Sequence, residues 1–226
     1  MSRLPQSDTS KKPVPWIDGH CHLADPRLAD RLDPLLSQCR VLGIHTWVQG
    51  GYDPADWNRQ LALVSRYGSA IVPVFGLHPW WVARLSDEAS LRVALTELEA
   101  ALPRSRAVGE TGLDFLPRHG SEQSRRLQHV AFNAQLDLAN RFDKPLVLHV
   151  VRAHDEAISV LAPRVSGTAR GLVHAFNAPR DVARRYLDLG YHLSVGGAVT
   201  HDRNASLREA IPFLPLDRII LETDSP

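Results

Sequence analysis

Residues 145–150 read PLVLHV, a short run of apolar and β-branched residues that carries a histidine near its end. A run of this length and composition predicts a buried strand. Residues 154–162 then predict a helix, and GLVHAF at 171–176 predicts another strand. A strand, a helix and a strand in succession are typical of a parallel pair joined by a right-handed crossover.

The same alternation extends over the chain in both directions. Further strands are predicted at 16–22, 44–49, 70–78, 106–110, 191–197 and 218–223, and further helices at 28–42, 54–67, 86–101, 121–142, 179–189 and 203–214. Ser86 and Ser121 are placed to cap helices, and Gly43 and Gly68 follow helix ends. Eight such repeats predict an α/β fold of the TIM (β/α)8 barrel type, with an open doubly wound sheet as the alternative.

No break in composition divides the alternating part of the chain. We therefore expect a single barrel domain over 15–226, preceded by a polar, flexible tail over 1–14. A regular barrel ends with a helix after its eighth strand, whereas this sequence ends at Pro226. Ile219, Leu221 and Thr223 should then face outward without a helix over them, which exposes an apolar strip. We expect the last helix to be missing from this chain, through truncation or disorder of a C-terminal segment.

The charge of the chain excludes a strong overall electrostatic field. The formal net charge is +1 for 226 residues, so a nucleic-acid partner would need positive charge gathered around a site. The sequence contains no run long enough to span a membrane, and its N-terminus lacks the apolar core of a signal peptide. The two cysteines, Cys21 and Cys39, are expected to be reduced thiols. We expect a monomeric, cytoplasmic protein.

The sequence WIDGHCH at 16–22 places two histidines on one face of a strand. Because side chains alternate along a strand, His20 and His22 project together and Cys21 points the other way, toward the helices. Two neighbouring imidazoles can begin a divalent metal site. Taken alone, the pair is equally well explained as a solvated strand end.

Other potential metal ligands follow the ends of other strands, the face where barrel enzymes gather their catalytic groups. They are His78, Glu110, His149, His174 and Asp224. The remaining histidines are assigned no role, because His45 and His192 begin strands and His119, His129 and His201 lie in loops or on a helix; His154 is left open. This distribution favours a metal centre over a set of unrelated histidines.

The number of candidate ligands exceeds what one open catalytic metal needs. We expect two divalent ions, held by His20, His22, Glu110, His149, His174 and Asp224. Glu110 stands between the other ligands and is the natural bridge, while Asp224 could also accept a proton from water. The metal could be Mg, Mn or Zn, although histidine-rich ligation suits zinc or manganese better than magnesium alone.

Six motifs occur along the chain in a specific order. They are WIDGHCH (16–22), GLHPWW (76–81), AVGETGLDF (107–115), PLVLHVVRAH (145–154), VHAF (173–176) and LETDSP (221–226). In order and spacing the set resembles the TatD-type metal-dependent deoxyribonucleases of the metal-dependent hydrolase superfamily. The H-x-x-R-x-H pattern that starts at His149 is most similar to the YjjV-like branch of that family.

The resemblance implies a barrel hydrolase that cleaves phosphodiester bonds, often as a 3′-to-5′ exonuclease, with a metal-activated water attacking phosphorus. It implies that His20 and His22 hold one metal together with Asp224, that His149 and His174 hold the other, and that Glu110 is shared. His78 matches a histidine that is not a ligand but lies near the reacting phosphate. The expected catalytic residues are therefore Asp224, Glu110 and His78.

The expected partner is DNA or another phosphodiester, preferably single-stranded. The residues expected to bind it are Arg152, His78, Trp80 and Asp114, with Arg118, Arg180 and Arg203 as further arginines that follow strands. The spacing of Arg152 from His149 is a feature of the family, and guanidinium groups suit phosphate oxygens. Trp80, together with Trp81, either stacks on bases or packs against the barrel rim.

The sequence departs from the family pattern in two loops. Asn177-Ala178-Pro179 stands where a serine- and glycine-bearing loop is usual, and Phe115-Leu116 stands where a tyrosine is frequent. Members also continue past the DSP motif. These differences concern substrate contacts and the end of the fold, and leave the candidate ligands in place.

Two other functions remain open. Amidohydrolases that cleave C–N or ester bonds share the H-x-H barrel, but many bridge their metals with a carboxylated lysine at the end of the fourth strand. Glu110 occupies that place here, and Lys144, the single lysine outside the tail, precedes the fifth strand. The third possibility is a catalytically impaired scaffold that keeps its metals, which the altered loop and the missing last helix would fit.

Overall fold

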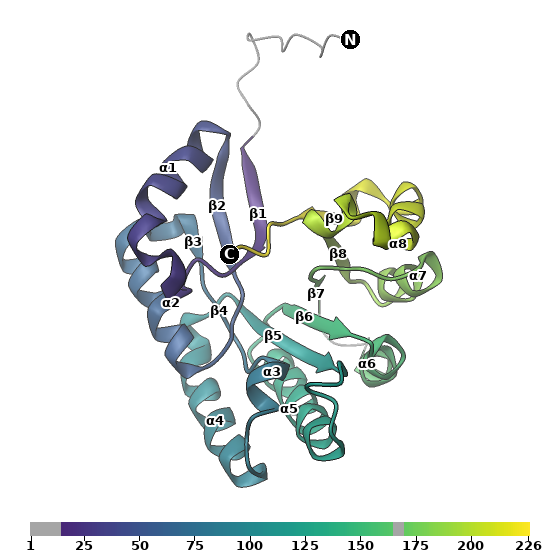
Figure 1. Ribbon diagram of the computed structural model, residues 1–226. Helices are drawn as coiled ribbons and strands as arrows, with labels where there is room; N and C mark the ends of the chain where they lie inside the picture. The colour runs from purple at the N-terminus through teal and green to yellow at the C-terminus, as the bar shows by residue number, and fades with distance from the viewer. Residues whose placement is uncertain (1–14, 165–169) are drawn as a thin grey trace.

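Parallel strands form the centre of the molecule, whose computed structural model describes residues 15–164 and 170–226 (Figure 1). The strands are β1 (Trp16–Cys21), β2 (Ile44–Gln49), β3 (Ile71–Val72), β4 (Val74–Phe75), β5 (Ala107–Asp114), β6 (Leu146–Val151), β7 (Gly171–Val173), β8 (His192–Val195) and β9 (Ile219–Leu221). They pair in the orders β1-β2-β3 and β4-β5-β6-β7-β8-β9, and every pair is parallel. This is the arrangement that a repeated strand–helix unit predicts.

Pro73 divides the strand predicted at 70–78 into β3 and β4. Proline has no N–H to donate to a neighbouring strand, so the ladder is interrupted there. The first half pairs with β2 and the second half pairs with β5. This one divided strand therefore links the two sheets into a single series.

The chain after β9 returns to β1 and completes the ring. The backbone N–H of Asp224 donates to the carbonyl oxygen of His20 at 3.0 Å, and the N–H of His22 donates to that of Ser225 at 2.7 Å. The buried carboxylate of Asp18 accepts bonds from the backbone N–H of Thr223 at 2.9 Å and from its hydroxyl at 2.6 Å. The predicted α/β fold of the TIM-barrel type is confirmed.

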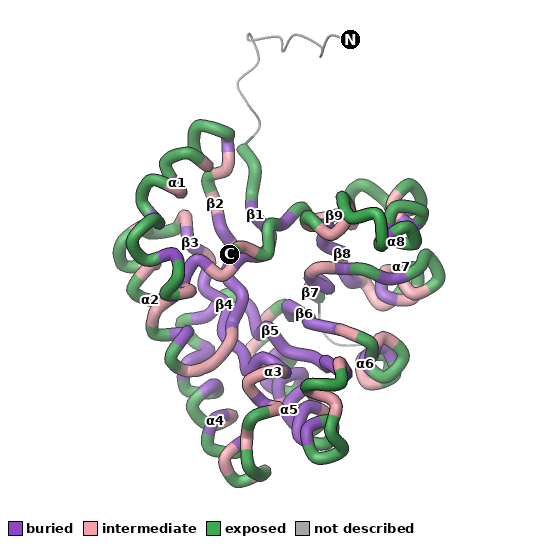
Figure 2. The backbone as a smooth tube through the Cα atoms, in the orientation of Figure 1, coloured by how far each residue is buried: buried purple, intermediate pink, exposed green. Residues whose placement is uncertain are grey.

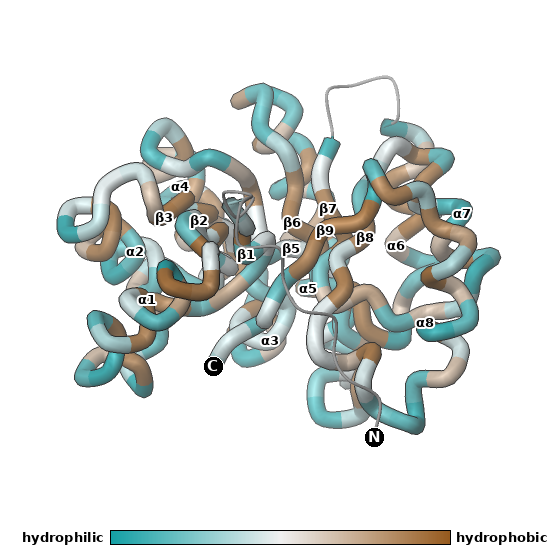
Figure 3. Tube along the Cα trace, turned by 90° about the horizontal axis from the view of Figure 1, so that it is seen from above, coloured by the Kyte–Doolittle hydropathy of each residue, from teal (hydrophilic) through white to brown (hydrophobic). Residues whose placement is uncertain are grey.

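The helices cover the outside of the strands. They are α1 (Leu32–Val41), α2 (Pro54–Tyr67), α3 (Pro79–Val82), α4 (Glu88–Ala101), α5 (Glu122–Arg141), α6 (His154–Leu161), α7 (Arg180–Asp188) and α8 (Ala205–Ala210). Seen from above, α1 and α2 lie on one side of the strands and α7 and α8 on the other (Figure 3). The strands are mostly buried, whereas the outer faces of the helices are exposed (Figure 2).

Some helix ends differ from those that the sequence predicts. The helix predicted at 28–42 begins only at Leu32, after the 3-10 helix η1 (Pro26–Arg31). Asp87, and not Ser86, caps α4, because its carboxylate accepts the N–H of Ser90 at 2.8 Å. The helix predicted at 203–214 is shorter, since the chain tightens into a 3-10 turn around Pro212, which cannot continue an α-helix. Ser121 caps α5 as predicted, with its hydroxyl accepting the N–H of Ser124.

The apolar core has an inner and an outer part. Inside the ring, β4, β5, β6 and β7 contribute Val74, Ala107, Val147 and Leu172, against which Val48 and Ile220 pack. Outside, a larger cluster joins the strands to α4–α8, and a separate cluster around Trp47 joins β1–β3 to α1 and η1 (Pro26–Arg31). Cys21 belongs to this last cluster and is fully buried, which confirms that it points away from the two histidines beside it.

The strand alternation predicted near the C-terminus is also observed. Ile220 packs into the ring, and Leu221 faces outward with 50% of its surface exposed. Thr223 is exposed as predicted, and its hydroxyl is bonded to Asp18. The tail predicted over 1–14 lies outside the described residues. Within 15–164 and 170–226 no helix has both the length and the apolar character that crossing a membrane requires.

We expect Asp18→Ala to lower the free energy of unfolding by about 3 kcal/mol, because it leaves the N–H and hydroxyl of Thr223 without their charged acceptor. Urea unfolding followed by circular dichroism measures this change. Asp30→Ala, which removes an exposed carboxylate, should change the free energy of unfolding by less than about 0.5 kcal/mol. Equal stability of the two variants would show that the Asp18 bonds do not hold the ring closed.

Candidate metal centre

The predicted ligands converge at one end of the strand ring. Most lie at the end of a strand or just after it: His20 and His22 by β1, His78 by β4, His149 by β6, His174 by β7 and Asp224 by β9. Glu110 lies inside β5, which continues to Asp114 and so extends beyond the strand predicted at 106–110. Apart from His22 and Asp224, all of these residues are buried. The structure therefore brings together every residue that the sequence proposes as a metal ligand.

Glu110 lies at the centre of this group, and its two carboxylate oxygens face different histidines. Oε2 lies 3.3 Å from Nε2 of His20 and 3.1 Å from Nε2 of His22. Oε1 lies 2.7 Å from Nε2 of His174 and 3.2 Å from Nδ1 of His149. One buried carboxylate thus contacts two pairs of histidines, of which His20 and His174 also stack on each other, with ring centres 4.1 Å apart.

Two further side chains complete the cluster. Oδ1 of Asp224 lies 3.5 Å from Nε2 of His20 and 3.4 Å from Nε2 of His22, on the side of Oε2. Nε2 of His78 lies 3.3 Å from Oε1 of Glu110, while its Nδ1 accepts the backbone N–H of Trp80 at 3.0 Å. His78 is therefore held in place by the first turn of α3.

Local backbone features direct Glu110 and the first histidine pair toward each other. The pairing of β5 with β6 shifts register between Gly109 and Thr111, so that Glu110 is an extra residue that turns into the ring. Gly50, at the end of β2, leaves the space into which these side chains project. A Cβ atom there would lie 2.4 Å from Cε1 of His22 and 2.7 Å from Oε2 of Glu110.

The charges of the cluster depend on one another. Burial would raise the pKa of Glu110, but the surrounding histidines, His174 foremost, hold it well below its usual range. Burial would lower the pKa of His22, yet the facing carboxylates raise it to about 10. The pKa of His149 is raised to about 9 in the same way, mainly by its bond to Asp114. Without a metal, these two histidines carry protons at neutral pH.

The donor set fits divalent cations. Three groups of ligand atoms lie close enough to share an ion: His20, His22 and Asp224; His20, Glu110 and His174; and His78, Glu110 and His149. Among the described residues, Oε2 of Glu110 and Nδ1 of His20 are buried without a hydrogen-bond partner. Imidazole nitrogens and carboxylate oxygens gathered in one buried group are the ligands expected for zinc or manganese.

The family model for TatD related DNase matches residues 17–226 of this chain. The chain belongs to the TatD-related DNase family. The resemblance inferred from its six motifs is confirmed.

Several relatives cover nearly the whole chain. An uncharacterized metal-dependent hydrolase, YjjV of Escherichia coli K12, is 33% identical over 93% of this chain and 79% of its own length. The crystal structure of YjjV superposes with a TM-score of 0.83 over 92% of this chain and 78% of that chain. The human deoxyribonuclease TATDN3 is 31% identical over 94% of this chain and 78% of its own length. The 3′-5′ ssDNA/RNA exonuclease TatD of Klebsiella pneumoniae is 31% identical over 86% of this chain and 72% of its own length.

Asp114 does not lie where a substrate-binding residue would. It is fully buried, and Oδ2 lies 2.6 Å from Nε1 of Trp80 and 3.0 Å from Nε2 of His149. Its Oδ1 accepts the backbone N–H of Leu116 at 2.9 Å. The prediction that Asp114 contacts the substrate is therefore corrected, because the carboxylate is fully engaged beneath the surface.

A pocket of about 500 Å³ opens over the cluster, and residues that the sequence analysis did not single out form much of its wall. His22, His78, Trp80, Glu110, His149, His174 and Asp224 line it, together with Tyr52, Arg27, Arg59 and Arg84. These last four follow β1, β2 and β4. Isolated tyrosines and arginines of this kind give no signal in a sequence, so only the fold reveals them.

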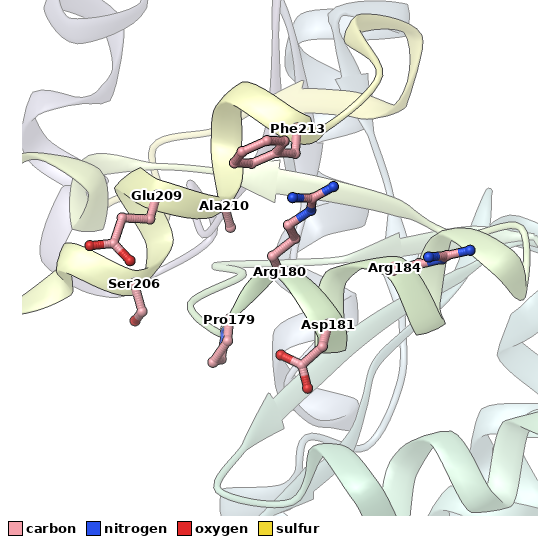
Figure 4. Close-up of a pocket in the computed structure, with 8 residues that line it drawn as sticks. All are labelled: Pro179, Arg180, Asp181, Arg184, Ser206, Glu209, Ala210 and Phe213. Carbon is pink, nitrogen blue, oxygen red and sulfur yellow. The ribbon is translucent and has the colours of Figure 1, made fainter.

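The arginines expected at the mouth take different positions. Arg152 is exposed and is not among the residues that line this pocket, and its substrate-binding role stays a prediction. Arg180 lines a separate groove between α7 and α8, where its guanidinium carbon lies 3.7 Å from the ring centre of Phe213 (Figure 4). Arg118 lies over Trp80 at 5.0 Å from the ring centre.

We expect Gly50→Ala to weaken the binding of Mn²⁺ by at least about tenfold, because the new methyl group would displace His22 or Glu110. Gly197→Ala is the matched control, since a Cβ there meets no atom within 4 Å. Competition titration with a chelating dye measures both affinities. Equal affinities in the two variants would contradict the geometry described for Gly50.

Proposed function

We propose that this protein is a two-metal-dependent phosphodiesterase that removes nucleotides from the 3′ end of single-stranded DNA. The observation that carries this proposal is the placement of Glu110, whose two oxygens face separate histidine pairs within 3.3 Å. Family membership and the names of the relatives support the same reaction class. Two ions bridged by one carboxylate are typical of enzymes that hydrolyse phosphodiesters.

The ligands divide into two sets around the shared carboxylate. His20, His22 and Asp224 would hold one ion, His149 and His174 would hold the other, and Glu110 would contact both. When bound, the ions supply positive charge that stabilises the phosphate oxygens and makes water more acidic. The buried position of Glu110 keeps its charge in a low-dielectric environment, where this attraction is strongest.

Asp224 is the residue best placed to accept a proton from the attacking water. Its side chain is 44% exposed and lines the pocket, so water reaches it. Burial would raise the pKa of Asp224, but the bond to His22 and the charge of His174 keep it below its usual range. The carboxylate is therefore ionised at neutral pH and can act as a base.

His78 is proposed to position the phosphate. Its Nδ1 is occupied by the N–H of Trp80, so that Nε2 faces Glu110 and the pocket. Burial lowers the pKa of His78 to about 4, and the imidazole is neutral at physiological pH. A neutral ring can donate one N–H to a phosphate oxygen without repelling the neighbouring cations.

The amidohydrolase alternative is less well supported by the structure. Lys144 donates its ammonium group to the carbonyl oxygen of Ser105 at 2.6 Å, before β6 begins and away from the ligand cluster. It cannot serve as a carboxylated bridge, and Glu110 takes that place. A metal-binding scaffold without activity would keep the same ligands, so only an assay separates it from an enzyme.

We expect the metal-free protein to bind close to two Mn²⁺ ions per chain. The pKa values of about 10 for His22 and about 9 for His149 mean that binding at pH 7 displaces these protons, so affinity should rise with pH. Calorimetry in buffers of different ionisation enthalpy measures the number of ions and of released protons. Saturation at one ion, or affinity that falls as pH rises, would contradict the two-set arrangement.

We expect the Mn²⁺-loaded protein to shorten single-stranded DNA from its 3′ end and to hydrolyse bis-p-nitrophenyl phosphate, with EDTA abolishing both activities. His20→Ala combined with Glu110→Ala should lower kcat by at least about 1,000-fold, because both ion sites lose a ligand. His45→Ala, at the opposite end of β2, is the control and should keep its activity.

Oligonucleotides labelled at either end report the direction of cleavage. Activity that survives in the double variant would rule out the proposed mechanism. Rapid hydrolysis of a cyclic amide without any phosphodiester cleavage would favour the amidohydrolase class. Metal binding without hydrolysis of either substrate would favour the scaffold.

A further inference from the structure

Trp80 lines the pocket, yet its indole N–H is bonded to a carboxylate that is fully buried. Nε1 of Trp80 lies 2.6 Å from Oδ2 of Asp114, and the same oxygen lies 3.0 Å from Nε2 of His149. A single carboxylate oxygen therefore connects a pocket-lining indole with a histidine of the Glu110 cluster.

The two ring nitrogens of His149 have separate partners. Nε2 faces Asp114, whereas Nδ1 lies 3.2 Å from Oε1 of Glu110 and 3.0 Å from Nε2 of His174. Because Nε2 donates its proton to the carboxylate, the lone pair left for an ion is that of Nδ1. Histidine ligands are commonly oriented in this way, by a carboxylate bonded to the second nitrogen.

Asp114 itself is held from several directions. Its Oδ1 accepts the backbone N–H of Leu116, and its own backbone N–H and carbonyl oxygen bond to the side chain of Gln128 on α5. Burial would raise the pKa of Asp114, but the bonds from His149 and Trp80 lower it to about 2. The carboxylate is thus an anionic acceptor whose Oδ2 is fixed by two side-chain donors, one of which is the indole.

The ring of Trp80 is covered by neighbouring side chains. The imidazole of His119 stacks on it with ring centres 5.3 Å apart and an interplanar angle of 21°. Arg118 lies over the same indole and donates to His119 at 3.0 Å. His78 meets the ring at an angle of 66°. These contacts hold the ring in place and occupy part of the surface on which a base could stack.

We propose that Trp80 is a positioning residue, which fixes the orientation of His149 through Asp114, and that it is not a stacking platform for bases. This inference rests on the proposed role of His149 as a metal ligand. It also gives a role to Asp114, whose carboxylate is too deeply buried to bind substrate.

The test compares Trp80→Phe with Trp81→Phe in the full chain. Phenylalanine keeps an aromatic ring but removes the indole N–H together with the second ring. Trp81→Phe removes the same atoms, and Trp81 is a matched control because it packs against the main core. Competition titration with a chelating dye gives the dissociation constant for Mn²⁺ at each site. We expect Trp80→Phe to weaken Mn²⁺ binding at one of the two sites by about tenfold. Asp114→Asn should weaken binding at the same site by about 10- to 100-fold. Trp81→Phe should change neither constant.

A double variant shows whether the two residues act in series. If Trp80 works through Asp114, Trp80→Phe combined with Asp114→Asn should bind Mn²⁺ no more weakly than Asp114→Asn alone. If the losses of Mn²⁺ affinity caused by the two single substitutions multiply in the double variant, the inference is overturned. Wild-type affinity in Trp80→Phe would overturn it as well.

Kinetics separate positioning from base stacking. Under positioning, Trp80→Phe raises the Mn²⁺ concentration needed for half-maximal activity equally for DNA and for bis-p-nitrophenyl phosphate, which has no base. A raised KM for DNA alone, with unchanged metal affinity, would assign Trp80 to stacking and overturn the inference. A wild-type protein that binds no metal would instead refute the proposed function.

Discussion

The structure depends on one buried negative charge, the carboxylate of Glu110, at the end of the strand ring. Removing such a group from water is expensive unless charged or hydrogen-bonding partners surround it. Histidines from four strands approach it to within 3.3 Å, and they hold its pKa well below its usual range. The register shift in β5 and the absence of a side chain at Gly50 make this convergence possible. The barrel can therefore be seen as a frame that brings imidazoles from distant parts of the chain around one anion.

Glutamines on the helices hold the strand ends on which the cluster rests. The side chain of Gln60 on α2 bonds to the N–H of Val74 at 2.9 Å and to the carbonyl oxygen of Gly50 at 3.1 Å. Gln135 and Gln128 on α5 bond in the same way to the backbones of Leu77 and Asp114. Strands that bend toward the mouth leave backbone groups unpaired, and buried groups of this kind must find partners. These amides take the place of the missing strand ladder and keep the ligand-bearing loops rigid.

The fold and the ligands could be predicted from the sequence because their signals are local. Each strand is a short apolar run, and a histidine or acid such as His149 or Glu110 at its end falls on the mouth by the geometry of a parallel barrel. The pocket wall could not be predicted in this way, since Tyr52 and Arg84 lie on loops whose paths depend on packing. Asp114 shows the same limit. Its motif points to a role in the site, but only its burial beneath Trp80 shows that its carboxylate faces His149, a candidate metal ligand, and not the substrate. The remaining differences between prediction and structure also have local causes. Ser86 and Asp87 are both suitable caps for α4, and Pro73 interrupts a predicted strand.

The bond between Asp18 and Thr223 joins positions that are 205 residues apart, and Asp224 is carried on the same closing segment. Closing so long a loop has an entropic cost, so this contact belongs among the last to form. During synthesis, the group made of Glu110, His149 and His174 can assemble well before Asp224 leaves the ribosome. The group of His20, His22 and Asp224 must wait until Asp224 has been made. A nascent chain would thus acquire its two ion-binding groups in a fixed order.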